Sequence, residues 1–212
     1  MAAVQRLMRR KAIFLFFVFF PFAALAQSAR DNADDAERLV KALDLRAGSV
    51  VGEIGAGSGE LTVLLAKAVG ETGRLFSNEL NAERRAEIAS AAAAAGLKNV
   101  VIVEGAPADA NLPEGCCDAV FMRNVYHHFA DPPSMNGSLF RAVKPGGRIA
   151  VMDFAPSGPE SETPAGRAEQ THHGVSAASV ARELRAAGFI DDTSEHVRGG
   201  MFIVVARRPS TP

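Results

Sequence analysis

The sequence predicts an α/β protein built on a doubly wound, mostly parallel sheet. Helical and strand patterns alternate along most of the chain, and the first strand, which begins at Val50, runs into a glycine-rich turn followed by an apolar helix. Alternating strands and helices favour parallel pairing, because each helical crossover returns the chain to the same edge of the sheet. Open sheets of this kind bind ligands beyond the carboxyl ends of their strands, so the glycine-rich turn is the first candidate site.

The remaining elements are assigned from the spacing of apolar residues and from the residues that interrupt it. Helices are expected over residues 31–45, 61–69, 82–95, 133–143 and 175–187, the first of them behind Asp and Asn capping residues. Strands are expected over residues 73–80, 100–103, 119–123, 148–154, 192–198 and 201–207. The last two strands are joined by Gly199 and Gly200, which predicts a closing hairpin.

Composition indicates one domain and argues against a nucleic-acid partner. The chain has 212 residues and a net charge of −1, with no tryptophan and a single tyrosine. No basic footprint or base-stacking surface is therefore expected. Cys116 and Cys117 are adjacent, so we expect no disulfide between them on geometric grounds and interpret them as small buried residues of a strand.

The N-terminus has the three-part plan of a secretory signal peptide. A basic cluster at residues 6–11 precedes an apolar run over residues 12–20, and Ala24-Leu25-Ala26 offers a cleavage site before Gln27. The sequence therefore predicts a signal peptide over residues 1–26, a domain over residues 27–212 and a periplasmic location. The alternative is an uncleaved segment that anchors the protein to the inner membrane. The adjacent pair Arg9 and Arg10 also suggests the hypothesis of export by the twin-arginine route.

The glycine loop itself limits the choice of ligand. Gly55, Gly57 and Gly59 alternate along it, and Glu60 stands where a phosphate-binding loop has lysine and where a dinucleotide fingerprint has its third glycine. Glu53 and Glu60 flank the loop, so we expect them to repel a pyrophosphate and to suit a ligand with positive charge.

The segment Glu53-Ile54-Gly55-Ala56-Gly57-Ser58-Gly59 resembles motif I of the class I S-adenosylmethionine-dependent methyltransferases. Residues 117–129, with Tyr-His-His-Phe at 126–129, and residues 141–154, with Lys-Pro-Gly-Gly at 144–147, resemble motifs II and III. The resemblance covers residues 31–208. It implies a Rossmann-like, doubly wound, seven-stranded sheet that is mostly parallel with an antiparallel C-terminal strand. It also implies S-adenosylmethionine as the methyl donor and a small-molecule acceptor.

The cofactor site is expected along the carboxyl ends of the first four strands. Glu79 ends the second strand about twenty residues past the glycine loop, where a carboxylate can accept both ribose hydroxyl protons. At the third strand the resemblance implies an acid against the adenine amino group, but Ala106 occupies that position, so either Asp109 or the backbone of Ala106 is expected to serve. The complete predicted set is Glu53, Gly55, Ala56, Gly57, Gly59, Glu79, Leu80, Ala106, Asp109 and Asn124.

No catalytic residue is fixed by the sequence. His127 and His128 are the candidates for a general base, which is needed only where the acceptor must lose a proton. A metal site is not expected, because neither this pair nor His172 and His173 has a typical ligand spacing. The polar segment 155–174 is interpreted as a binding loop, with Arg167, His172 and His173 as candidates for acceptor recognition.

Several alternatives stay open at the level of sequence. A non-catalytic module that binds S-adenosylmethionine or S-adenosylhomocysteine would keep the same loop, whereas a nicotinamide oxidoreductase and an aminopropyltransferase fit the surrounding residues less well. S-adenosylmethionine is made in the cytoplasm, so a periplasmic enzyme would need a supply of it, and export with the cofactor already bound is one solution. Any membrane contact is expected only through an uncleaved N-terminal segment, and the sequence fixes neither the acceptor nor the oligomeric state.

Overall fold

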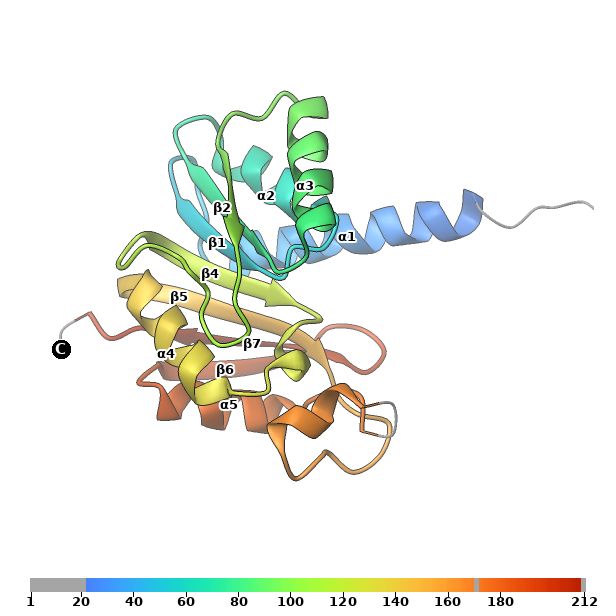
Figure 1. The fold of residues 1–212 in the computed structure, drawn as a ribbon, viewed down its shortest axis with the longest axis vertical. Coiled ribbons are helices and arrows are strands. Elements are labelled where there is room, and N and C mark those ends of the chain that lie inside the picture. Colours follow the sequence, from blue (N-terminus) through green and yellow to red (C-terminus); the bar gives the residue numbers. More distant parts are fainter. Residues whose placement is uncertain (1–21, 170–171, 211–212) are drawn as a thin grey trace, which may run out of the picture.

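A computed structural model describes residues 22–169 and 172–210, and it shows one seven-stranded sheet in the order β3-β2-β1-β4-β5-β7-β6 (Figure 1). The strands are β1 (Val50–Ile54), β2 (Arg74–Glu79), β3 (Val100–Glu104), β4 (Cys117–Arg123), β5 (Val143–Phe154), β6 (Ile190–His196) and β7 (Met201–Arg207). The helices are α1 (Phe22–Ala42), α2 (Glu60–Val69), α3 (Ala82–Ala94), α4 (Pro132–Ala142) and α5 (Ala177–Ala186), with short 3₁₀ turns η1 (Tyr126–His128) and η2 (Pro164–Ala168).

The sheet confirms the predicted fold class. Strands β1 to β5 pair in parallel, and β7 runs antiparallel between β5 and β6. The order of strands reverses between β1 and β4, so the glycine loop after β1 lies at the switch point where open α/β sheets form a ligand crevice.

The sheet is covered on both faces, and each face has its own apolar core. Helices α1 and α2 pack against one face, where Leu39 and Leu65 are fully buried. Helices α4 and α5 pack against the other face through Leu139 and Leu184 (Figure 1). Helix α3 lies beside α2 at the β2–β3 end. This double burial explains why the central strands are apolar on both sides.

Two element boundaries differ from the expected ones. Helix α1 begins at Phe22 and passes through the Asp and Asn residues that were expected to cap it near residue 31. Asn32 instead accepts a hydrogen bond from Arg123, at the end of β4, and Asp35 forms ion pairs with Arg123 and Arg198. Strand β5 begins at Val143 and so includes the Lys-Pro-Gly-Gly segment, with a register irregularity against β4 between Cys117 and Ala119.

The prediction about the two cysteines is wrong in one respect. Cys116 and Cys117 form a disulfide, with Cα atoms 3.7 Å apart, at the point where the chain enters β4. Adjacent residues lie closer than the usual bridged pair, which is why the geometry argued against this bond. The other part of the prediction is confirmed for Cys117, which is fully buried in its strand.

The predicted signal peptide lies largely outside the described residues, which begin at Phe22 within α1. Cleavage after Ala26 would remove five residues from this helix and would leave the part that packs on the sheet. Within the part of the chain that the structure describes, no helix has both the length and the apolar character to cross a membrane.

Candidate cofactor site and its histidine edge

The glycine loop between β1 and α2 fits closely against its neighbours on two sides and is open on the third. A Cβ atom at Gly55 would lie 2.5 Å from Cγ2 of Val125, and one at Gly59 would lie 3.2 Å from Cα of Ile88. At Gly57, where φ is +59°, a Cβ atom would meet only the Arg84 guanidinium, at 3.6 Å. The loop is thus clamped between the β4 side and α3, and Gly57 faces space that the protein leaves free.

Glu79 connects this loop to the next strand. Its carboxylate accepts a hydrogen bond from the Gly57 backbone N–H at 2.9 Å and another from the Asn81 N–H at 3.0 Å. The residue is 8% exposed at the end of β2. A carboxylate oxygen can accept more than one hydrogen bond, so both oxygens keep capacity for ligand hydroxyl groups beside Gly57. The assignment of Glu79 to a ribose stays a prediction.

Glu53 lies beneath the loop, with its carboxyl group buried against α2. Oε2 accepts a hydrogen bond from the Thr62 hydroxyl at 2.5 Å and a longer one from the Ser77 hydroxyl at 3.5 Å. Burial raises the pKa of Glu53 to about 8, although the bond from Thr62 acts in the opposite direction. The side chain is therefore mostly protonated at neutral pH, so the expected repulsion of a pyrophosphate by Glu53 does not apply in the ligand-free protein.

Leu80 follows β2, and Ala106 and Asp109 follow β3, at the same carboxyl edge of the sheet as the glycine loop. Leu80 is 58% exposed, which is unusual for a leucine at the end of a buried strand. The Ala106 N–H donates to the Asp109 carbonyl at 3.1 Å, and the Asp109 carboxylate accepts from the Asn111 N–H at 2.8 Å. These polar groups therefore form hydrogen bonds within the turn, and their contact with an adenine stays a prediction.

Asn124 follows β4 in a strained backbone conformation. Its φ is +57°, which is uncommon for a residue other than glycine, and its N–H donates to the Met152 carbonyl at 2.9 Å. Such conformations gather at binding sites, because the surrounding structure has to hold them in place. Asn124 is exposed at the same edge of the sheet as the glycine loop.

Helix α1 is fastened to this edge by a buried acid that the sequence did not single out. Asp35 is fully buried and forms ion pairs with Arg123, at the end of β4, and with Arg198, in the turn before β7. Burial alone would raise the pKa of Asp35, but the hydrogen bonds and charges of Arg198 and Arg123 outweigh it and lower that pKa. These ion pairs hold α1 against the end of β4 and the β6–β7 turn.

His127 is the buried member of the predicted histidine pair. Its Nδ1 lies 2.8 Å from Oδ1 of Asp153, at the end of β5, and its backbone N–H donates to Oδ2 at 3.2 Å. Its Nε2 has no hydrogen-bond partner among the described residues. His128 is exposed, and partial burial together with the charges of His127 and His173 lowers its pKa. An acid at the end of the fifth strand was the signal in the sequence that could have identified Asp153.

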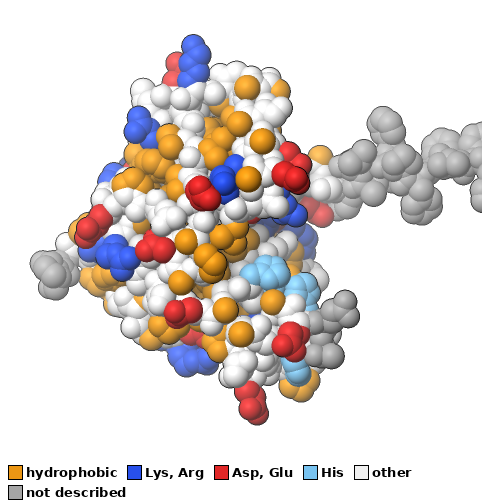
Figure 2. Space-filling view, in the orientation of Figure 1, with side chains coloured by type: hydrophobic (Ala, Val, Ile, Leu, Met, Phe, Trp, Pro, Cys, Tyr) orange, Lys and Arg blue, Asp and Glu red, His pale blue; other side chains and the backbone are white. Residues whose placement is uncertain are grey.

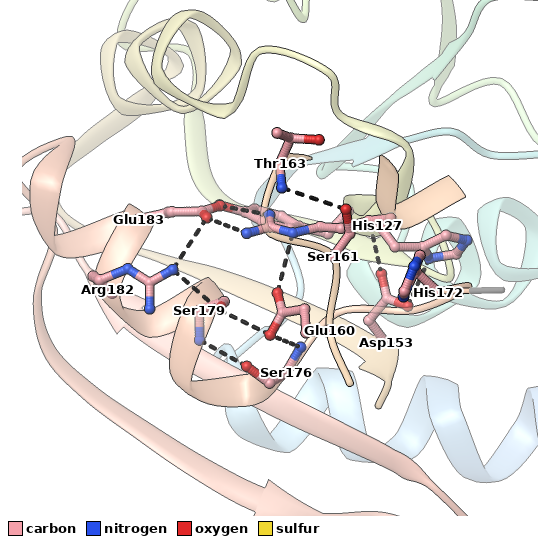
Figure 3. A network of polar contacts seen from close by, with 12 residues as sticks. His127, Asp153, Glu160, Ser161, Thr163, His172, Ser176, Ser179, Arg182 and Glu183 are labelled. Carbon is pink, nitrogen blue, oxygen red and sulfur yellow. Dashed lines mark hydrogen bonds and ion pairs between the residues drawn. The ribbon is translucent and has the colours of Figure 1, made fainter. Parts of the chain in front are cut away.

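The segment 155–174 is attached to α5 by a polar network. The Arg167 guanidinium is buried, with Nε 3.1 Å from Glu160 and a terminal nitrogen 2.6 Å from Glu183. Figure 3 shows Glu160 bonded in turn to Ser176 and Ser179 at the start of α5. Arg167 is thus buried and paired with two acids of the protein, and its contact with an acceptor stays a prediction.

His172 and His173 separate in the structure. Nδ1 of His172 lies 3.0 Å from the Pro159 carbonyl, within its own loop (Figure 3). The His173 ring lies with its centre 4.7 Å from that of His127 and 5.0 Å from that of Phe154. The carboxyl edge of the sheet thus holds the glycine loop, the Glu79 carboxylate, the strained Asn124 and a histidine cluster.

Comparisons with known proteins identify the class. Residues 52–151 match the model of a family described as a methyltransferase domain. The chain is 33% identical over 171 residues to 27-O-demethylrifamycin SV methyltransferase of Amycolatopsis mediterranei, covering 76% of this chain and 61% of the relative. It is 30% identical over 119 residues to the ubiquinone/menaquinone biosynthesis C-methyltransferase UbiE of a Marinomonas species, covering 56% of this chain and 47% of that protein. The chain thus spans about half to three fifths of these curated relatives.

Solved structures agree on the fold. An S-adenosylmethionine-dependent methyltransferase from Aquifex aeolicus superposes with a TM-score of 0.73 at 24% identity, covering 89% of this chain and 98% of the other. Residues 52–151 are therefore similar to a methyltransferase domain, and the chain has the fold of a methyltransferase that depends on S-adenosylmethionine. The residues fit that molecule, since Gly57 leaves an open cradle and Glu79 presents a carboxylate beside it.

Proposed function

We propose that this protein transfers a methyl group from S-adenosylmethionine to a small-molecule acceptor. The observation that carries the proposal is the glycine loop, which is closed by Val125 and Ile88 but open at Gly57, with Glu79 bonded to its backbone. S-adenosylmethionine supplies an activated methyl group on a sulfonium. The chain itself has to bind both reactants and align them, which is the main source of acceleration in such transfers.

Different residues are proposed to bind different parts of S-adenosylmethionine. The Glu79 carboxylate is proposed to hold the ribose, and the exposed Leu80 to cover the adenine. The backbone around Gly55, Ala56 and Gly57 approaches the amino-acid portion, where the absence of side chains permits close contact. Asn124 is proposed to complete this surface from the end of β4.

The acceptor side is proposed to be the histidine edge. Asp153 is an acceptor for the Nδ1 proton of His127, which leaves Nε2 with a free lone pair in the neutral ring. Between the two candidates from the sequence, this arrangement favours His127 over His128 as the group that takes a proton. The proposed acceptor is therefore one that must lose a proton, such as a hydroxyl compound or an acidic carbon.

A non-catalytic binding module is the competing function, and the same pair of residues argues against it. A module that only binds S-adenosylmethionine has no need for a buried imidazole oriented by a carboxylate, with its second nitrogen left unpartnered. Buried polar atoms without partners are costly and tend to be kept where chemistry uses them.

The first test is calorimetric titration of residues 27–212 with S-adenosylmethionine and, as a control, with NAD. Binding of S-adenosylmethionine alone would support the cofactor site and would open a screen of hydroxyl and carbon acids with radiolabelled donor. Binding of neither ligand would refute the proposal. Cofactor binding without turnover on any acceptor would favour the binding module.

We also propose that the protein is exported, with cleavage after Ala26 and a periplasmic location. The support is the basic and apolar pattern of residues 6–20, which precedes the small residues 24–26. Intact-mass analysis of protein from periplasmic and membrane fractions tests this. A chain that begins at Gln27 in the periplasm is the expected result, whereas an uncut chain in the membrane fraction would indicate an anchor, and an uncut chain in the cytoplasm would refute export.

A further inference from the structure

Three histidine side chains from two separate segments converge beside the candidate acceptor site. His127 and His128 belong to η1, after β4, and His173 lies just before α5. One ring nitrogen from each lies within 4.8 Å of the other two. Figure 2 shows histidine side chains grouped on one face of the molecule. The sequence argued against a metal site because the ligand spacing is unusual, but the fold brings both histidines of the first pair and one of the second to the same place.

The buried histidine is oriented as a metal ligand. Nδ1 of His127 is engaged by the Asp153 carboxylate at 2.8 Å, and Nε2 is buried without a partner among the described residues. Histidines that bind metals almost always place their other ring nitrogen against a carboxylate or a carbonyl, which fixes the ring and makes the ligating nitrogen more basic. The negative charge of Asp153 would also offset part of the charge of a cation held by neutral imidazoles.

The other two rings can complete the site with small movements. His128 and His173 are exposed, and their ring centres lie 4.0 Å and 4.7 Å from that of His127. A tetrahedral ion bound at about 2.0–2.1 Å keeps its nitrogen ligands roughly 3.3 Å apart. The nitrogens therefore have to approach by about 1.5 Å at most, which rotation of two exposed side chains can supply.

We propose that His127, His128 and His173 bind a divalent transition-metal ion of the zinc type, with a fourth position left open toward the acceptor side. Three imidazoles suit Zn²⁺, Cu²⁺ or Ni²⁺ and not Mg²⁺ or Ca²⁺, which prefer oxygen ligands. The Nε2 lone pair of His127 can hold either a proton or the metal. Metal binding therefore competes with the proton-accepting role proposed above, but it does not depend on that role or on methyl transfer.

The test is a zinc titration of the full, untagged protein after treatment with a chelator and in the absence of S-adenosylmethionine. Calorimetry is expected to show one Zn²⁺ per chain, and Co²⁺ is expected to give the strong visible absorption of a tetrahedral site. His173→Ala should weaken Zn²⁺ binding by about 100-fold or more, because even an outer-shell partner contributes about 10–100-fold. Asp153→Asn should weaken it by about 10–100-fold.

Two matched variants control for zinc binding elsewhere. His172→Ala removes the neighbouring histidine, which faces the Pro159 carbonyl, and His196→Ala removes an exposed histidine at the end of β6. Both should bind Zn²⁺ as the natural sequence does. Absence of binding at submillimolar Zn²⁺, or equal affinity in His173→Ala and His172→Ala, would overturn the proposal. Because His173 is exposed, its replacement is expected to leave the circular dichroism spectrum and the Tm unchanged.

Discussion

Replacement of Gly57 by valine gives the sharpest test of the cofactor site. The residue has a φ of +59°, and the nearest protein atom to an added Cβ is a guanidinium nitrogen of Arg84, at 3.6 Å. The fold can therefore accept the side chain without a clash. The cost to stability is limited to the left-handed backbone, which is about 1–2 kcal/mol for an L-residue. For a domain of this size that corresponds to a fall in Tm of about 2–8 °C.

The effect on binding should be much larger than the effect on stability. The valine methyl groups project into the space beside Glu79 that is assigned to the cofactor. This space cannot hold the methyl groups and the cofactor together. We expect the affinity for S-adenosylmethionine to fall by more than about 100-fold, which corresponds to about 2.7 kcal/mol. The assay is calorimetric titration, with the folded fraction checked by circular dichroism.

Gly115→Val is the matched control. Gly115 has the same φ of +59°, and no protein atom lies within 4 Å of an added Cβ. It precedes β4 and so lies at the opposite edge of the sheet from the glycine loop. The two variants should lose similar stability, and only Gly57→Val should lose binding. An unchanged affinity of Gly57→Val for S-adenosylmethionine, or an equal loss of that affinity in both variants, would refute the position assigned to the cofactor.

Three further predictions concern the acids around the site. Glu79→Gln should weaken S-adenosylmethionine binding by about 10–100-fold in the same titration, because hydrogen bonds to a charged acceptor contribute about 1.5–3 kcal/mol; an unchanged Kd would remove Glu79 from the site. Asp35→Asn should lower the free energy of unfolding at pH 7 by about 1–3 kcal/mol, since it leaves Arg123 and Arg198 without the charge of their buried partner. Because the two arginines hold the pKa of Asp35 low, this stabilisation is present above the unfolded-state pKa and is lost as the pH falls below about 4, so urea unfolding of variant and natural protein should converge in acid. Burial raises the pKa of Glu53 from 4.5 to about 8, so its contribution to stability is complete below the lower value and is lost as the pH rises through the higher one. Urea unfolding at pH 5.5 and pH 8 should therefore show a decline, at most about 1.4 kcal/mol per pH unit, that Glu53→Gln reduces; an identical decline in both proteins would contradict a neutral buried Glu53.

The sequence by itself determined the fold class and predicted the place of the site. The three alternating glycines, the apolar strand before them and the alternation of helices and strands are local patterns, so they can be read without knowledge of long-range contacts. The same holds for Glu79, because its place at the end of the second strand follows from chain order alone. The seven-stranded sheet with its antiparallel last strand confirms the predicted fold class, while the role of Glu79 stays a prediction.

Only the tertiary structure decided which polar side chains are available for chemistry. Arg167 and His173 lie in the same polar loop and look equivalent in sequence, yet Arg167 is buried between Glu160 and Glu183 while His173 lies beside His127. Asp153 becomes the partner of His127 because β4 and β5 are neighbours in the sheet. These contacts join residues far apart in the chain, and their energies depend on burial and on distances of a few ångströms. Periodicity and spacing carry no information about either quantity.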